Sequence, residues 1–211
     1  MQKLIFSLVG STLISLSFAQ GIILKEGTDY TVITAPAKSV PSKAGKVNVS
    51  EFFSYACIHC ALIEPLLEQW LASSKNIELN RIQVVWEGHF SGYAKINATA
   101  QMMKLDSNFT QKTFDAVIKQ HQNLEDPAQL NSFLTANKQL VDPSKFMAIY
   151  NSFAVSSKPQ EYSQYTQAYN ISGTPSFVVG NKYMAKPAQP AKLIQVVQAL
   201  VDKVKKEQKI K

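Results

Sequence analysis

The chain has 211 residues, of which 45% are apolar, 18% are charged and two are cysteine, which is enough for one globular domain with a substantial core and excludes disordered and collagen-like chains. Lysine and arginine number 22 against 15 acidic residues, which gives a formal net charge of +7. Five lysines lie between Asp202 and Lys211, and the others are scattered without an aromatic-basic stripe, so the sequence gives little support for nucleic-acid binding.

Residues 1–19 have the pattern of a secretory signal peptide. Lys3 gives a positive start, residues 4–16 are largely apolar, and small residues surround a cleavage point at Ala19. The apolar stretch is shorter than the ~20 residues that cross a bilayer, although an uncleaved anchor is the alternative. Export would place the mature chain, from Gln20 onward, in an oxidising compartment, which in a bacterium is the periplasm.

The first half of the mature chain is expected to contain strands and one helix. Tyr30–Ile33 is a short β-prone piece, and apolar residues at every second position predict a strand over Lys46–Tyr55. A helix is expected to begin near Cys57, with a kink at Pro65. Apolar and β-branched residues over Glu78–Trp86 predict a further strand.

From Gly88 the apolar period changes from two to about 3.6, which predicts a block of helices. Two of these helices are expected to begin at Asp126 and Asp142, because each acid precedes a proline and can cap the first turn. A further helix is expected from Pro159. The block is uninterrupted by any predicted strand.

The last part of the chain predicts a β-hairpin over Thr174–Met184 and a helix with an apolar face from Leu193 to Val204. The sequence therefore predicts an α/β fold with one central sheet. The sheet domain comprises residues 20–87 and 172–211. An all-helical insertion, residues 88–171, interrupts it.

The two cysteines lie in Cys57-Ile58-His59-Cys60, where a predicted strand gives way to a helix. Spacing i, i+3 in a first helical turn puts both sulfurs on one side, within reach of a disulfide. At the helix N-terminus, unpaired N–H groups stabilise a thiolate and lower the pKa of Cys57, and a protonated His59 adds a positive charge. A stable thiolate is a good leaving group, which makes the disulfide a stronger oxidant.

Two segments of the chain resemble the DsbA family of thioredoxin-fold thiol:disulfide oxidoreductases. Glu51–Cys60 is similar to that family's strand and active-site turn, and Gly173–Pro175 to its cis-proline loop. Residues 88–171 fall where the family inserts its helical subdomain. The resemblance covers nearly the whole mature chain, and it implies a thioredoxin-like central sheet and a cis bond before Pro175.

The resemblance also implies which residues form the site. The expected catalytic residues are Cys57, Cys60, His59 and Glu51. The expected substrate-binding residues are Ile58, Thr174 and Pro175, beside a shallow apolar groove. Glu51 shares a strand face with Val49 and Phe53, so it is expected to be a buried acid that relays the proton of the second thiol, and Arg81 is a candidate partner.

The expected function is donation of the Cys57–Cys60 disulfide to reduced, unfolded exported proteins through a mixed disulfide. By resemblance, a DsbB-like quinone-linked membrane protein reoxidises the enzyme, which is expected to be a monomer. No metal or organic cofactor is required.

Several alternatives stay open. The family commonly has Pro-His after its first cysteine, whereas this chain has Ile58 before His59, and Thr174 is the residue type of isomerase-like relatives. A reductase or isomerase of the same fold is therefore one alternative, and a non-catalytic thioredoxin-like binding or chaperone module is another. The cysteine pair could also be half of a zinc site or an inert disulfide, although a zinc site would need two more ligands.

Overall fold

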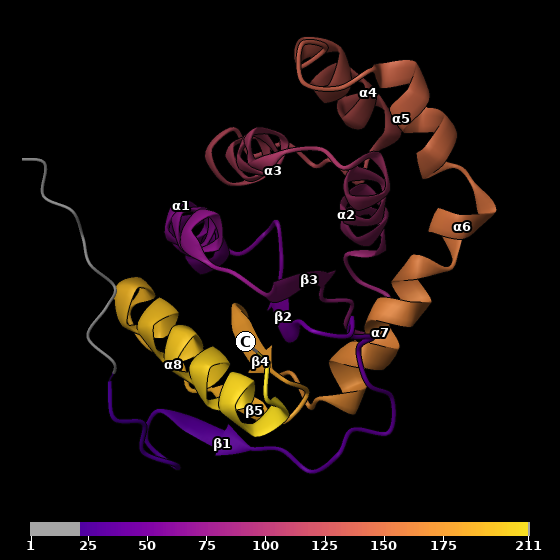
Figure 1. The fold of residues 1–211 in the computed structure, drawn as a ribbon. Helices are drawn as coiled ribbons and strands as arrows, with labels where there is room; N and C mark the ends of the chain where they lie inside the picture. Colours follow the sequence, from indigo (N-terminus) through magenta and orange to yellow (C-terminus); the bar gives the residue numbers. More distant parts are fainter. Residues whose placement is uncertain (1–21, 211) are drawn as a thin grey trace, which may run out of the picture.

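The computed structural model describes residues 22–210, so the expected signal peptide, residues 1–19, lies outside the described part (Figure 1). This part of the chain forms a sheet in the order β1-β5-β4-β2-β3. The strands are β1 (Tyr30–Val32), β2 (Val47–Phe53), β3 (Ile77–Gln83), β4 (Ser176–Val179) and β5 (Tyr183–Ala185). Strands β2 and β3 are parallel, and the other pairs are antiparallel. All the predicted strands are confirmed, with slightly different bounds.

The helices of the described residues include one that follows the cysteines, a block between β3 and β4, and one at the end of the chain. They are α1 (Ile58–Ser73), α2 (Ser91–Met103), α3 (Ser107–Phe114), the π-helical turn η1 (Asp115–Lys119), α4 (Pro127–Ala136), α5 (Pro143–Tyr150), α6 (Phe153–Ser156), α7 (Lys158–Ala168) and α8 (Pro190–Gln208). The two predicted capping acids, Asp126 and Asp142, accept hydrogen bonds from the backbone N–H groups of Gln129 and Lys145. Asp106 caps α3 in the same way.

Strand β2 is covered on both faces, which is more than its alternating sequence predicts. All seven of its residues are buried. Val47 and Val49 pack with α1 and α8 on one face, and Phe52 packs with α2 and α7 on the other. The polar residues of that second face are buried as hydrogen-bonded groups, because Asn48 donates to the Val40 and Pro41 carbonyls and accepts from Ser50.

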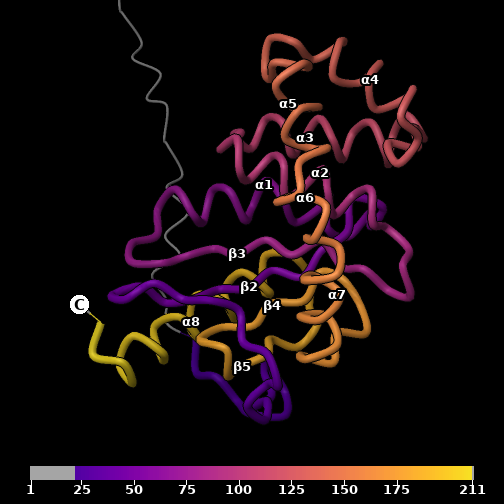
Figure 2. The backbone as a smooth tube through the Cα atoms, turned by 90° about the vertical axis from the view of Figure 1, so that its right-hand side faces the viewer, coloured from indigo at the N-terminus to yellow at the C-terminus, as the bar shows by residue number. Residues whose placement is uncertain are grey.

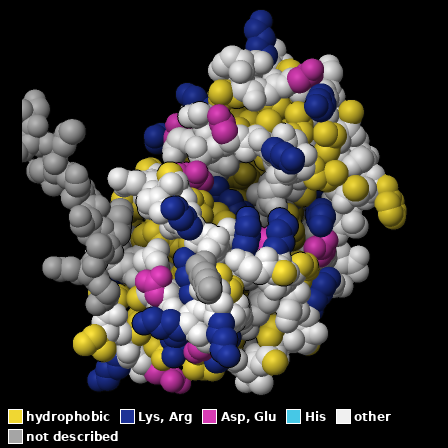
Figure 3. Space-filling model, in the orientation of Figure 1, with side chains coloured by type: hydrophobic (Ala, Val, Ile, Leu, Met, Phe, Trp, Pro, Cys, Tyr) yellow, Lys and Arg dark blue, Asp and Glu magenta, His cyan; other side chains and the backbone are white. Residues whose placement is uncertain are grey.

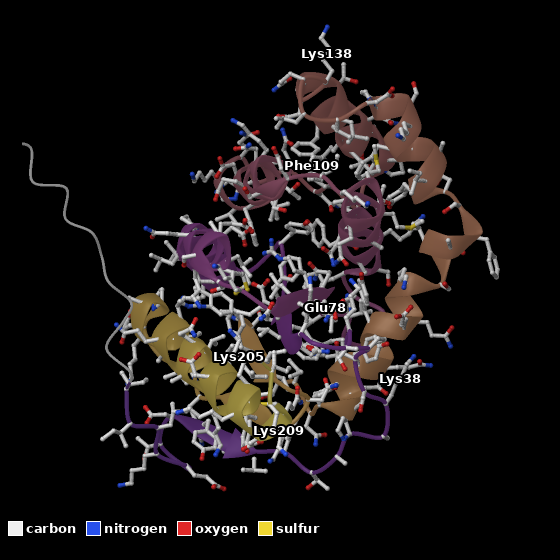
Figure 4. All side chains as sticks on the ribbon, in the orientation of Figure 1. Lys38, Glu78, Phe109, Lys138, Lys205 and Lys209 are labelled. Atoms are coloured by element: carbon white, nitrogen blue, oxygen red, sulfur yellow. The ribbon has the colours of Figure 1, made fainter. Side chains whose placement is uncertain are left out.

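The helical block shares a core with the active-site turn, because Phe53, Tyr55 and Cys60 belong to the same buried cluster as its phenylalanines. Phe109, Phe114, Phe133 and Phe146 are buried together in it, and Figure 4 places Phe109 among these helices. In Figure 2, α3, α4 and α5 form the upper part of the molecule, above the sheet, while α8 lies at the level of β4 and β5. None of the helices in residues 22–210 is long and apolar enough to cross a membrane.

Strand β3 is the edge of the sheet next to the helical block, and α2 covers it. Asn97 and Gln101 of α2 donate hydrogen bonds to the Arg81 carbonyl, at 2.9 and 2.7 Å. An edge carbonyl paired in this way cannot recruit another strand. The strand ends at Gln83, three residues before the predicted end, because its partner β2 ends at Phe53, the residue that pairs with Gln83.

Candidate active site

The turn between β2 and α1 presents the first cysteine at the start of the helix. Cys57 is the N-cap of α1, with an extended backbone at φ −101° and ψ 115°. Its N–H donates to the Ser54 carbonyl at 2.9 Å, and its own carbonyl accepts from Cys60 and Ala61. Both cysteines are free thiols in this structure, which therefore represents the reduced form. The Cys57 sulfur lies where the first N–H groups of a helix have no partner within the helix.

The two sulfurs have opposite electrostatic environments. The pKa of Cys57 is lowered to about 5, chiefly because the Cys60 thiol donates a hydrogen bond to it, and further because the Thr174 side chain and the backbone N–H groups of Cys60 and His59 do so. Partial burial of Cys57 opposes this effect without reversing it. Cys60 is 0% exposed, and burial raises its thiol pKa far above the ordinary value. At neutral pH the reduced site therefore holds one thiolate and one thiol.

The backbone N–H of His59 is one of the groups that lower the pKa of Cys57. The sequence suggests the charge of its imidazole, whereas the structure assigns the effect to its backbone N–H. The side chain of His59 is exposed.

The loop before β4 faces the cysteines. The Thr174–Pro175 peptide bond is cis, as the family resemblance implies. In the thiol form, Cys57 Sγ donates a hydrogen bond to the Thr174 carbonyl oxygen at 3.4 Å. Trp86 anchors the segment just before this loop, because its indole N–H donates a hydrogen bond to the Ile171 carbonyl at 3.2 Å.

A buried acid lies beneath the cysteines, as the sequence predicts. Glu51 is 0% exposed, and its Oε2 accepts from Arg81 Nε at 2.8 Å. Burial raises the pKa of Glu51 to about 7, although the Arg81 charge opposes that rise. Its other oxygen, Oε1, has no hydrogen-bond partner among residues 22–210. The negative charge of Glu51 also raises the pKa of Cys60, so the two groups are electrostatically linked.

Sequence reasoning missed that Arg81 serves more than one carboxylate. Glu64 accepts hydrogen bonds from both terminal nitrogens of the Arg81 guanidinium, one of them at 2.8 Å. The Glu68 carboxylate lies 3.7 Å from the same guanidinium. A signal for Glu64 was present, because it lies four residues after Cys60 in the buried stripe of α1 and is the charged residue of that stripe.

Gln83 is a second residue that the sequence did not reveal. Its side-chain oxygen accepts from the Tyr55 N–H at 2.9 Å, and its side-chain nitrogen donates to Ser54 Oγ at 3.2 Å and to the Val84 carbonyl at 3.0 Å. These bonds fix the turn that delivers Cys57 to the start of α1. The residue is 0% exposed and lies at the end of a strand, so only the fold reveals its partners.

A groove of about 600 Å³ adjoins the cysteines. Its lining includes His59, Thr174 and Pro175, three of the residues predicted to lie near a substrate groove. The other lining residues are Ile63, Asn170, Ile171, Ser172, Gly173, Ser176, Met184, Ala185, Pro187, Ala188, Gln189, Pro190 and Leu193. Ile58 is not part of this lining. It is 48% exposed on α1, near Leu62, which is 57% exposed.

A reactive thiolate paired with a buried thiol, beside a cis-proline loop, defines a thiol:disulfide oxidoreductase of the thioredoxin class. Within residues 22–210, no group of three or more histidine, cysteine, aspartate or glutamate side chains is arranged to hold a metal ion.

Comparisons with known proteins identify the family. The family model described as a DSBA-like thioredoxin domain matches residues 87–197. The thiol:disulfide interchange protein DsbA of Burkholderia cepacia is 33% identical, over 95% of this chain and 97% of its own length. The DsbA of Pseudomonas aeruginosa is 28% identical, with 84% of each chain covered.

Solved structures give the same result. Reduced DsbA1 from Neisseria meningitidis superposes with a TM-score of 0.80 at 34% identity, covering 88% of this chain and 97% of that one. The DsbA of Pseudomonas aeruginosa superposes with a TM-score of 0.77 at 26% identity, covering 86% and 94%. The chain belongs to the DsbA family and is a thiol:disulfide oxidoreductase. The alternative of a non-catalytic module is therefore wrong.

Proposed function

We propose that this oxidoreductase works in the direction of oxidation, donating a Cys57–Cys60 disulfide to reduced proteins that have been exported to the periplasm. The observation that carries the proposal is the lowered pKa of Cys57. A thiol of low pKa favours the reduced form of the enzyme, so its disulfide gives up its oxidising equivalents readily.

The reaction takes place in two exchanges. A substrate thiolate attacks the Cys57 sulfur of the oxidised enzyme, the Cys57–Cys60 bond breaks, and its electron pair leaves on Cys60. A second thiolate of the substrate then attacks the substrate sulfur of this mixed disulfide, and Cys57 leaves as a thiolate. The substrate loses two electrons and gains a disulfide, and the enzyme becomes the dithiol form.

Glu51 is proposed to supply the proton that Cys60 takes up in the first exchange. Cys60 binds a proton firmly because burial raises its pKa. Glu51 has a pKa of about 7 and a carboxylate oxygen without a hydrogen-bond partner among the described residues. A group of this pKa both holds and releases a proton near neutral pH, which suits a relay.

The groove beside His59, Thr174 and Pro175 is proposed to hold an extended segment of the substrate. Its walls include apolar side chains such as Ile63, Met184 and Leu193, which suit unfolded chains of many sequences. Ile58 is proposed to contact the substrate from the opposite side of Cys57, because it is exposed on the first turn of α1.

Location and partners follow from the same proposal. The signal-peptide pattern of residues 1–19 supports export and cleavage, so the mature enzyme would work in the periplasm as a monomer. Reoxidation is assigned to a DsbB-like quinone-linked membrane protein, since the reduced enzyme needs an electron acceptor for each cycle.

The test is oxidative refolding of a reduced protein with several thiols, using stoichiometric oxidised enzyme and no other oxidant. We expect rapid formation of substrate disulfides together with an equal amount of the dithiol enzyme. An enzyme that instead reduces disulfides of the substrate, or only reshuffles a mispaired substrate, would show that the direction is reduction or isomerisation.

A further inference from the structure

Lysines from four separate segments meet at one end of the sheet, which we call the basic pole. The basic pole is defined by its charged residues Lys43, Lys46, Lys75, Glu78, Lys182, Asp202, Lys203, Lys205, Lys206, Glu207 and Lys209. Contacts between the segments hold it together. Lys205 Nζ donates to the Lys75 carbonyl at 2.8 Å, Lys43 pairs with Glu78 at 2.9 Å, and Lys182 pairs with Glu207 at 3.0 Å.

The basic pole carries the whole net charge of the described chain. Residues 22–210 have 20 basic and 15 acidic side chains, a net of +5. Eight of those basic and three of those acidic side chains belong to the basic pole, which is also a net of +5. The remaining twelve basic and twelve acidic residues cancel. The charge is therefore concentrated at one place, although the sequence scatters these lysines over residues 43–209.

The pole is at the opposite end of the molecule from the cysteines. It surrounds the start of β2, the connection from α1 to β3 and the last turns of α8, whereas Cys57 follows the end of β2 at the start of α1. In Figure 2 the end of α8 and the α1–β3 connection lie on the left. Figure 3 faces this pole and shows dark blue side chains over α8 and the neighbouring strand ends, and Figure 4 labels Lys205, Lys209 and Glu78 there.

Helix capping explains only part of this arrangement. Lys205 and Lys206 lie in the last turn of α8, where cations stabilise the C-terminal end of a helix. Lys46, Lys75 and Lys182 lie outside helices and have no such role. Several of these side chains are also free to bind a partner, because Lys46, Lys75, Lys206 and Lys209 are exposed and form no ion pair within residues 22–210.

We propose that the basic pole binds the anionic surface of a phospholipid bilayer. Its eight lysines act as point charges, and point charges suffice for attraction to a diffuse anionic surface such as a phospholipid bilayer. An exposed apolar residue adjoins it, because Ile22 packs beside Lys203 and Lys206 and the next residue, Ile23, is 96% exposed. Lysines bordering an exposed apolar side chain are typical of surfaces that lie on a membrane.

Because the basic pole and Cys57 lie at opposite ends of β2, binding at the pole leaves the redox site uncovered. The binding itself needs neither cysteine, so it can be tested apart from the redox proposal.

The experiment measures co-sedimentation of the purified chain with vesicles of phosphatidylcholine alone or mixed with phosphatidylglycerol. We expect binding to the anionic vesicles at low ionic strength and release in high salt. A variant with Lys46, Lys206 and Lys209 all changed to Gln should bind about tenfold more weakly or worse. The matched control changes Lys112, Lys138 and Lys145 to Gln, which removes the same charge from exposed positions of the helical block and should leave binding within about twofold.

The results divide clearly. All three proteins share the same N-terminus, so residues 1–21 do not affect the comparison, and an unchanged glutathione redox equilibrium shows that each is folded. The proposal is overturned if the wild type does not bind anionic vesicles, if neutral vesicles bind equally well, or if both variants lose binding equally. Stronger binding to a DNA duplex than to vesicles at the same salt concentration would assign the pole to nucleic acid instead.

Discussion

Cys57 and Cys60 lie in one helical turn, yet their surroundings shift their pKa values in opposite directions. Hydrogen-bond donors converge on the partly exposed Cys57 from the cis-proline loop and from the start of α1, and they lower its pKa. Cys60 lies in an apolar layer beneath, above the buried Glu51, and its pKa is raised. Position relative to the surface, more than spacing in the sequence, therefore decides which cysteine can attack and which retains its proton.

Neutral hydrogen-bond donors stabilise the thiolate of Cys57 in the exposed layer. In the buried layer around Glu51, one cation, Arg81, neutralises the carboxylates. Arg81 faces the carboxylates of Glu51, Glu64 and Glu68, so the buried layer has an excess of acid. Excess acid favours retention of protons, which is consistent with the raised pKa of Glu51.

The largest effect is expected from the exposed sulfur. Cys57→Ser should lower the rate of disulfide transfer by on the order of 10³-fold or more, because it removes the atom that the substrate attacks. Cys60→Ser cannot form the internal disulfide, so it should not oxidise a reduced substrate. With a substrate that already holds a disulfide, its Cys57 thiolate should attack that bond and stay in a mixed disulfide, detected by non-reducing electrophoresis, because no Cys60 thiol is present to displace the substrate. If Cys57→Ser kept its activity, the assignment of the two sulfurs would be wrong.

Loss of the buried cation should have the largest effect on stability. Arg81→Met leaves Glu51 and Glu64 buried without a counterion, which should cost about 3–5 kcal/mol of unfolding free energy. A buried carboxyl group whose pKa is raised on folding contributes folding stability that is fully present below its unfolded pKa, near 4.5. That contribution is lost as the pH rises through the folded pKa, which is about 7 for Glu51. The deficit should therefore be smallest near pH 4.5 and greatest above pH 7 in denaturant titrations.

The control for that variant is Lys119→Met. Lys119 pairs with Asp115 at 2.8 Å but is 70% exposed, so its loss should cost less than about 1 kcal/mol at every pH. An Arg81→Met variant that matched this control would show that the buried carboxylates do not need the guanidinium.

A smaller effect is expected from the cis-proline loop. Thr174→Val removes the hydroxyl that stabilises the Cys57 thiolate. A hydrogen bond to a charged group contributes about 1.5–3 kcal/mol, so the pKa of Cys57 should rise by roughly one to two units. Thr113→Val is the control, because Thr113 is buried and its hydroxyl donates to the Phe109 carbonyl within α3 instead of contacting Cys57. Equal pKa values in both variants would contradict the role of Thr174.

The smallest effect is expected from Trp86, whose indole N–H binds the segment just before the cis-proline loop. Trp86→Phe removes the indole N–H that holds the Ile171 carbonyl, with a loss of about 1 kcal/mol of stability and a modest fall in the transfer rate. Trp70→Phe is a matched control, because its indole N–H donates to Gln198 Oε1 between α1 and α8. Both variants should be destabilised, and only Trp86→Phe should be slower. Equal rates would mean that the loop is held by other contacts.

The fold was predictable from the sequence wherever the signal was local. Capping acids before prolines gave the starts of α4 and α5, and the apolar period gave β2 and α8. The family resemblance supplied the cis bond before Pro175. The end of β3 was misplaced because the sequence Val84 to Trp86 is apolar and strand-like, while the chain geometry ends the strand at Gln83.

The candidate site was predictable where residues are neighbours in the sequence, and less so where the fold brings distant residues together. The Cys57 and Cys60 pair and the burial of Glu51 could be predicted. The contacts of Gln83 with the active-site turn could not, because they join residues 28 and 29 positions apart. The basic pole was hidden for the same reason, since its lysines come together only after folding.

The central claim is that the Cys57 sulfur is a thiolate at neutral pH. Its most direct test is the pH titration of thiolate absorbance in the reduced protein, with Cys57→Ser to identify the signal. The account predicts a transition centred near pH 5 that is missing from the variant. A transition near the ordinary cysteine value, about 8.5, would contradict it.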